Sequence, residues 1–115
     1  MATRRDRALS YYESLDEGDY EALSSLLAEG FVHDRPDLTL EGRERFVRFM
    51  REERPRTDTT HEVDGVYVGG PPDGEDDPEV VVRGRLLADG QLLVDFADAF
   101  TFEGDRIARI VTYTQ

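Results

Sequence analysis

The sequence predicts an α+β fold in which three N-terminal helices pack on a curved, mainly antiparallel sheet that closes around them as a cone. Two observations lead to this fold class. Apolar residues recur with a helical period up to residue 54 and with a strand period of two from residue 59 onwards. At 115 residues the chain also has room for one hydrophobic core only, so residues 1–115 are expected to form a single domain.

The first two helices are bounded by recognisable end signals. Residues 3–17 carry an apolar stripe at helical spacing and are followed by Gly18, a residue common after helix ends. Asp19 is a good N-cap for a second helix over residues 20–29, which ends before Gly30. The short connection between them predicts an antiparallel pair.

A third helix follows a short extended segment. Residues 31–34 (FVHD) are interpreted as a brief strand or an extended arm, because Pro36 comes soon after. Residues 43–54 have apolar side chains on one face and arginines on the other, and the helix is expected to end before Pro55.

The second half predicts a meander of strands at residues 59–68, 79–88, 91–102 and 106–114. Asp-Gly and Gly-Asp pairs mark the two tight turns between the last three strands. Residues 69–79 (GGPPDGEDDPE) are acidic and rich in Pro and Gly, so a mobile surface loop is expected there. A curved sheet of this kind leaves an apolar cavity between its concave face and the helices, where a small ligand can bind.

The charge is strongly negative, with 26 acidic against 14 basic residues, and the sequence contains no lysine. Such a surface repels nucleic acid and anionic membranes, so neither is expected as a partner. The composition resembles that of proteins from halophiles, in which molar salt screens the self-repulsion. An acidic mesophilic protein, or a coding bias towards arginine, is the open alternative.

Other classes are excluded by what the sequence lacks. With no cysteine, the protein has no disulfide, thiolate nucleophile or cysteine-ligated zinc. The two histidines, His33 and His61, do not stand at a helical metal-binding spacing, so no metal or cofactor is expected. No apolar run is long enough to span a membrane or form a secretory signal, and a cytoplasmic location is expected.

Asp98 is an unusual residue for its predicted strand, because alternate side chains place it on one face with Phe96 and Phe100. Three interpretations stay open. Burial without a partner would keep the carboxyl neutral and able to donate a hydrogen bond. Pairing with Arg83 or Arg85 on the neighbouring strand would keep it ionised. A bend in the strand would instead bring it to solvent.

Two motifs, in order and at matching spacing, carry a family resemblance: L-x-x-G-D-x-x-x-L over residues 15–23 and D-x-F-x-F-x-x-D-x-I over residues 98–107. With them, nearly the whole chain resembles the nuclear transport factor 2-like superfamily, in its SnoaL-like polyketide cyclase and ketosteroid isomerase branch. The resemblance implies a cystatin-like α+β barrel, a functional cavity inside the cone and a homodimer formed through the sheet.

The resemblance also implies site residues. In ketosteroid isomerases a tyrosine and a protonated aspartic acid hold an enolate oxygen while another aspartate moves the proton. The matching positions here are Tyr11, Asp98 and Asp34, although an ungapped count places Arg35 at the third one. Tyr11 can equally be a core residue, and residues 33–35 can serve as a cap and salt bridge. The expected ligand-binding residues are His33, Arg35, Phe31, Phe46, Met50, His61, Phe96 and Phe100.

Two functions follow from this reasoning. One is a cofactor-independent acid–base enzyme, an isomerase, cyclase or epoxide hydrolase, acting on a small apolar molecule that carries an oxygen. The hydrolase would use Asp34, Asp98 and Arg85 or Arg35 to activate water. The other is a non-catalytic ligand-binding or association module. If Asp34 faces the cavity with Asp98 the enzyme is favoured, and if Asp34 points to solvent the module is favoured.

The outer face of the sheet is expected to form the homodimer. Leu93, Ala97, Ala99 and Thr101 make the odd-numbered side of their strand small and apolar, which is unusual for a solvated surface.

Overall fold

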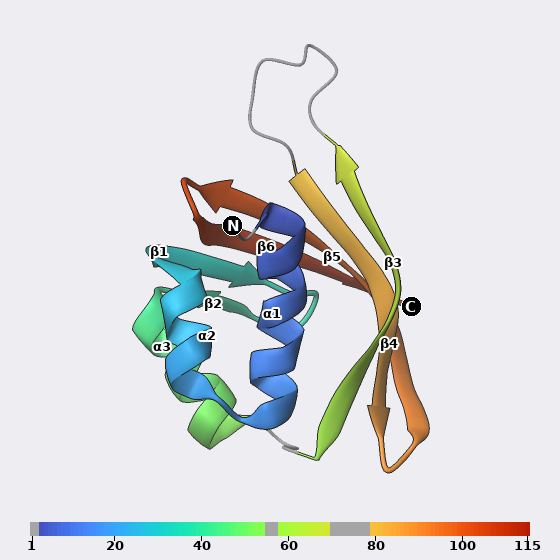
Figure 1. Ribbon diagram of the computed structural model, residues 1–115. Coiled ribbons are helices and arrows are strands. Elements are labelled where there is room, and N and C mark those ends of the chain that lie inside the picture. Colours follow the sequence, from blue (N-terminus) through green and yellow to red (C-terminus); the bar gives the residue numbers. More distant parts are fainter. Residues whose placement is uncertain (1–2, 55–57, 70–78) are drawn as a thin grey trace.

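The computed structural model describes residues 3–54, 58–69 and 79–115. Helices fill the concave face of one strongly curved sheet (Figure 1). The helical elements of this part of the chain are α1 (Arg4–Glu17), α2 (Tyr20–Leu26), α3 (Arg43–Arg48) and the π-helical turn η1 (Phe49–Glu53), which continues α3.

The sheet has six strands in the order β2-β1-β6-β5-β4-β3. β1 runs parallel to β6, and every other neighbouring pair is antiparallel. The predicted fold class, helices packed on a curved and mainly antiparallel sheet, is therefore confirmed. The strands are β1 (Leu27–Asp34), β2 (Thr39–Glu41), β3 (Thr59–Gly69), β4 (Glu79–Ala88), β5 (Gln91–Glu103) and β6 (Arg106–Thr114).

The ends of the first helices follow from local chemistry. The Thr3 side chain accepts a hydrogen bond from the backbone of Asp6, and the Asp6 side chain accepts one from the backbone of Thr3, so α1 begins with a capping box. Gly18 ends α1 in the left-handed conformation at φ 71°. The Asp19 side chain then accepts from the backbone N–H of Ala22 and caps α2.

The second helix is shorter than predicted. It ends at Leu26, and the backbone is already extended at Leu27, where β1 begins beside Ile107 of β6. The apolar pattern over residues 20–29 did not reveal this change, because a buried leucine satisfies either structure. Leu27 is indeed fully buried. Strand pairing with β6 decides the backbone here, and that contact is not visible in local periodicity.

Two further features are a strand that was not predicted and a predicted loop that lies mostly outside the described residues. The strand β2 was not predicted, since three residues are too few to show an alternating pattern. Of the expected loop over residues 69–79, Gly69 and Glu79 are the end residues of β3 and β4, and residues 70–78 lie outside the described part of the chain.

Gly84 allows two strands to approach closely where β3 carries a bulge. It lies opposite Val63, and the pairing of β3 with β4 shifts between Val63 and Gly65. A Cβ atom at position 84 would clash with the backbone carbonyl oxygen of Glu62 and press on the ring of Phe96. Glycine is therefore required for this bend in the sheet.

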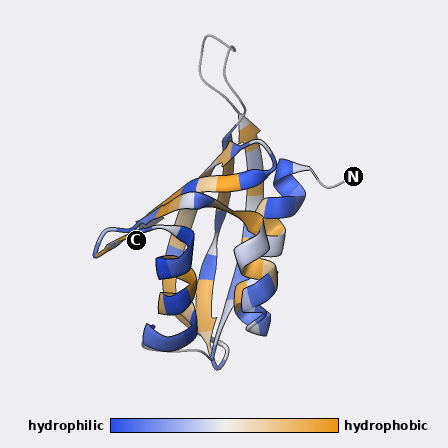
Figure 2. Ribbon diagram, turned by 90° about the vertical axis from the view of Figure 1, so that its left-hand side faces the viewer, coloured by the Kyte–Doolittle hydropathy of each residue, from blue (hydrophilic) through white to orange (hydrophobic). Residues whose placement is uncertain are grey.

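The core lies between the helices and the concave face of the sheet. In Figure 2 both hydrophilic and hydrophobic colours occur along the helices, as expected when each helix buries one side. None of the described helices is long and apolar enough to cross a membrane. Large, fully buried core side chains include Phe31, Phe46, Phe100, Leu23, Leu27, Ile107 and Ile110.

Candidate functional site

A cavity of about 470 Å³ lies between the helices and the sheet. Its size is in the range of small-molecule sites. Several polar side chains converge on an otherwise largely apolar wall. The polar and charged lining residues are Tyr11, His33, Arg35, Asp37, Arg54, Thr59, His61, Asp98, Thr112 and Thr114, and the apolar ones include Leu15, Met50, Leu86, Val94 and Phe96.

Asp98 is buried in the cavity wall and held by two hydroxyl groups. The residue as a whole is only 6 % exposed. Tyr12 donates a hydrogen bond to its Oδ2 at 2.6 Å, and Thr112 donates to its Oδ1 at 2.5 Å. Burial raises the pKa of Asp98 above its ordinary value, although both hydrogen bonds oppose the shift. Burial therefore shifts this carboxyl towards its neutral form relative to an exposed aspartate.

Two of the three interpretations of Asp98 are wrong. The residue does not reach solvent, and neither expected arginine pairs with it. Arg85 pairs with Glu62 and Asp64 instead, and Arg83 is exposed. The remaining interpretation is met in part, because the carboxyl is buried and has no arginine partner, but it accepts hydrogen bonds from two hydroxyl groups where no partner was expected.

Tyr12, a member of the apolar stripe that predicted the first helix, is the tyrosine that contacts Asp98. Tyr11 lies beside it, with ring centroids 5.1 Å apart, and lines the cavity. Within the described residues the Tyr11 hydroxyl has no hydrogen-bond partner. Burial raises the pKa of Tyr11 well above its usual value, so the hydroxyl keeps its proton and is available as a donor to a ligand. An apolar stripe on a helix gives no signal that distinguishes these two hydroxyls.

His33 extends the hydrogen-bonded chain. Its Nε2 lies 2.8 Å from the Thr112 hydroxyl, and because Thr112 donates its one hydrogen to Asp98, Nε2 is the donor in this contact. Burial, reinforced by Arg35, lowers the pKa of His33 to about 3, so the ring is neutral. Its Nδ1 is buried and has no partner.

His61 is paired with a carboxylate that sequence reasoning missed. Its Nδ1 lies 2.6 Å from Oδ1 of Asp16, and its backbone N–H donates to Oδ2 of the same carboxylate at 3.0 Å. A carboxylate only accepts, so Nδ1 carries a hydrogen and the neutral ring has its lone pair at Nε2. The ring is largely buried, packs 5.0 Å from that of Tyr12 and lines the cavity. The separation of 45 residues left no signal in the sequence.

Asp34, the expected proton-moving residue, lies outside the cavity. It accepts hydrogen bonds from Arg109 at 2.7 Å and Thr39 at 3.0 Å, and its side chain is 36 % exposed. These contacts lower its pKa. The reason is strand alternation: His33 points inward, so Asp34 points outward. Arg35 does line the cavity, where it pairs with Asp37 at 3.1 Å.

The structure brings most of the other expected residues to the cavity, namely Tyr11, His33, Arg35, Met50, His61, Phe96 and Asp98. Phe31, Phe46 and Phe100 are fully buried beside it and do not line it. They fill the closed part of the core, where Phe31 and Phe46 have ring centroids 4.8 Å apart.

Leu93 was expected on the outer face of the sheet, and it borders the cavity instead. Residues of β5 change faces at a bulge, because Leu86 lies opposite Val94 whereas Leu87 lies opposite Leu92. Bulges cannot be located from alternation alone.

No cluster of three or more His, Asp or Glu side chains suited to a metal ion occurs in the parts of the chain that the structure describes.

Comparison with known proteins identifies relatives of this fold. A family profile described as SnoaL-like domain matches residues 8–110. An NTF2-like protein of unknown function from Cytophaga hutchinsonii superposes with a TM-score of 0.80 at 18 % identity, over 100 % of this chain and 92 % of that one. No curated protein matches the chain significantly.

Two further solved structures have names that point to chemistry. A candidate ketosteroid isomerase from Kribbella flavida gives a TM-score of 0.79 at 19 % identity, covering 97 % of this chain and 77 % of that one. A candidate polyketide cyclase from Sinorhizobium meliloti gives 0.76 at 20 % identity, covering 94 % of both chains. At this level of identity the likeness establishes the fold alone.

Proposed function

The chain belongs to the SnoaL-like domain family, with an NTF2-like fold, and we propose that it is a cofactor-independent enzyme that moves a proton on a small apolar molecule bearing a carbonyl-type oxygen. One observation carries the proposal. A single cavity is lined by the imidazole of His61, held by Asp16, and by the buried carboxyl of Asp98. The names of the isomerase-like and cyclase-like neighbours are in keeping with it.

His61 is the base in this proposal. Asp16 fixes the ring through two contacts and stabilises the positive charge that forms when Nε2 takes a proton. Nε2 has no hydrogen-bond partner in the described part of the chain. A base positioned in this way contributes about 10² to 10⁴ in rate.

Tyr11 and Asp98 stabilise the oxygen. The Tyr11 hydroxyl stays protonated and can donate to an oxygen on which negative charge develops. A neutral Asp98 can donate its own hydrogen, and it adds no negative charge beside the forming enolate. Tyr12 and Thr112 hold the Asp98 carboxyl in place, so little reorganisation is needed during the reaction.

The cavity does not contain the full set of residues that the hydrolase alternative requires. The hydrolase needed Asp34 and an arginine beside Asp98, but Asp34 pairs with Arg109 outside the cavity and Arg85 pairs with Glu62. Arg35 lines the cavity but pairs with Asp37. We therefore do not propose water activation by an Asp-Arg-Asp set.

A non-catalytic ligand-binding module is the second candidate, and the position of Asp34 favours it. The choice between enzyme and module was linked to Asp34 on the expectation that Asp34 was the base available to the cavity. His61 with Asp16 supplies another base, so the position of Asp34 no longer decides between the two functions.

Proton exchange on a model ketone distinguishes them. The probe is 2-tetralone, an apolar bicyclic ketone, and the assay is loss of its α-proton signals in D₂O by NMR. We expect the wild type to exceed the buffer rate, and His61→Gln to lose about 10² or more of that acceleration. The matched control is Asp34→Asn, which should exchange as the wild type does. Exchange at the buffer rate with bound probe establishes the module, and a His61→Gln variant as fast as wild type shows that His61 is not the base.

A further inference from the structure

Two buried nitrogen atoms in the cavity lining have no hydrogen-bond partner. They are Nδ1 of His33 and Nε of Arg54, and both residues line the cavity. Buried polar atoms without partners are rare in folded proteins, because each costs free energy that a hydrogen bond would recover. The guanidinium of Arg54 therefore has hydrogen-bonding capacity that the described part of the chain does not use.

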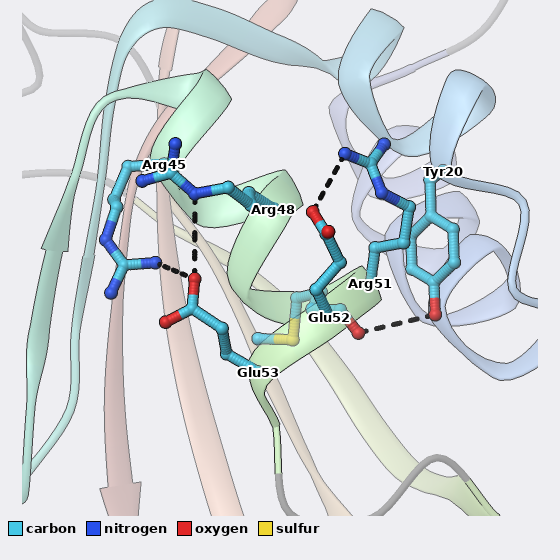
Figure 3. Close-up of polar contacts among 7 residues, drawn as sticks. Tyr20, Arg45, Arg48, Arg51, Glu52 and Glu53 are labelled. Atoms are coloured by element: carbon cyan, nitrogen blue, oxygen red, sulfur yellow. Dashed lines mark hydrogen bonds and ion pairs between the residues drawn. The ribbon is translucent and has the colours of Figure 1, made fainter.

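Arg54 differs from the arginines that precede it in the chain. Arg45 and Arg48 both pair with Glu53, and Arg51 pairs with Glu52, in exposed contacts along α3 and η1 (Figure 3). Arg54 follows directly after η1, where the backbone becomes extended. Within residues 3–54, 58–69 and 79–115 its guanidinium forms no ion pair.

The cavity consequently holds a spare positive charge. Among the lining residues that the structure describes, Arg35 is balanced by Asp37, and the Asp98 carboxyl contacts the hydroxyl groups of Tyr12 and Thr112 and no arginine. Arg54 is left unbalanced, in a protein whose net charge is -12. The strongly negative net charge opposes any general attraction of anions to this protein. A single cation inside the cavity is instead suited to bind one anionic group of a ligand.

We propose that the cavity binds a small apolar carboxylate, with the carboxylate on the guanidinium of Arg54 and the apolar body against Met50, Leu86 and Phe96. This substrate class rests on the proposed function, since it concerns the same cavity. Guanidinium groups bind carboxylates through paired hydrogen bonds. Tyr11, Arg35 and Arg54 all line this cavity.

The test compares two probes of the same shape, 2-naphthoate and its neutral amide, by isothermal titration calorimetry at one salt concentration. We expect the wild type to prefer the carboxylate by about tenfold or more, the difference typical of a charge-assisted hydrogen bond. Arg54→Gln should abolish the preference and leave amide binding unchanged. The matched control is Arg51→Gln, an exposed arginine three positions earlier that does not line the cavity, and it should keep the preference.

Several outcomes would overturn the proposal: no binding of the carboxylate to the wild type, equal binding of both probes, or a preference that survives Arg54→Gln. Equal binding would leave the acid–base function standing, because that function is measured separately by proton exchange. If circular dichroism shows that Arg54→Gln is misfolded, Arg54→Lys replaces it. That variant keeps the charge and should retain part of the preference over the amide, and its failure to do so counts against the proposal.

Discussion

Replacing Asp98 by Asn keeps the shape of the side chain and removes its titration. In the wild type, burial raises the pKa of Asp98 above the value in the unfolded chain, near 3.9. Between these two pKa values the native state binds more protons than the unfolded state. Wild-type stability therefore falls as pH rises through that window, and the variant escapes this loss.

The size of the effect follows from one proton. Within the window, the free energy of unfolding of Asp98→Asn relative to that of the wild type should increase by up to about 1.4 kcal/mol per pH unit. Near pH 4 the two proteins should differ by about 1 to 3 kcal/mol, because both carboxyl oxygens of Asp98 accept hydrogen bonds from Tyr12 and Thr112, whereas an amide can accept from only one of them. The pKa of His33 is lowered to about 3, so this residue reduces the free energy of unfolding as pH falls below about 6.5. Both proteins contain His33, so this contribution largely cancels in the comparison.

The assay is urea unfolding followed by circular dichroism from about pH 4 to 7 at fixed salt. Asp34→Asn serves as a control of opposite sign: the pKa of Asp34 is lowered by Arg109 and Thr39, so this variant should lose ground to the wild type as pH rises through the acid range. A difference between Asp98→Asn and wild type that does not change with pH would refute the buried, neutral acid. A wild type that gains on Asp98→Asn as pH rises would show that Asp98 is stabilised in its charged form.

Three further predictions concern the network, the surface and the assembly. Tyr12→Phe removes the hydrogen bond to Asp98 and should cost about 1 to 3 kcal/mol in urea unfolding; an unchanged stability would exclude that contact. The melting temperature should fall as potassium chloride drops below roughly 1 M, because screening of the net charge of -12 fails; a melt independent of salt would remove the halophilic interpretation. Light scattering should show a dimer that Ala99→Arg on the outer sheet face disrupts, and a monomeric wild type would contradict it.

The sequence was informative where structure is encoded locally. The change from helical to strand periodicity predicted α1, α3 and the four long strands, because apolar spacing reports directly which face of an element is buried. The same alternation placed Asp98 among phenylalanines on the inner face of β5, and it is buried there.

Long-range contacts and bulges determine the features that the sequence did not predict. Pairing of β1 with β6 converted Leu27 from helix to strand, and a bulge moved Leu93 to the cavity. Asp16 and His61 meet through the packing of α1 on β3, across a separation that no local pattern records. Tyr12 was hidden for another reason: its ring belongs to the core, and only its hydroxyl reaches Asp98.

The acid–base account depends most directly on which ring nitrogens of the histidines carry hydrogen, and the sequence has only two histidines to assign. Nitrogen-15 NMR of the histidine rings measures this. In the neutral rings we expect His61 to carry hydrogen at Nδ1, bonded to Asp16, and a bare Nε2 that shifts when 2-tetralone is added, while His33 stays neutral down to about pH 4. A His61 ring with its hydrogen on Nε2, or one that does not respond to the bound ketone, would contradict the account.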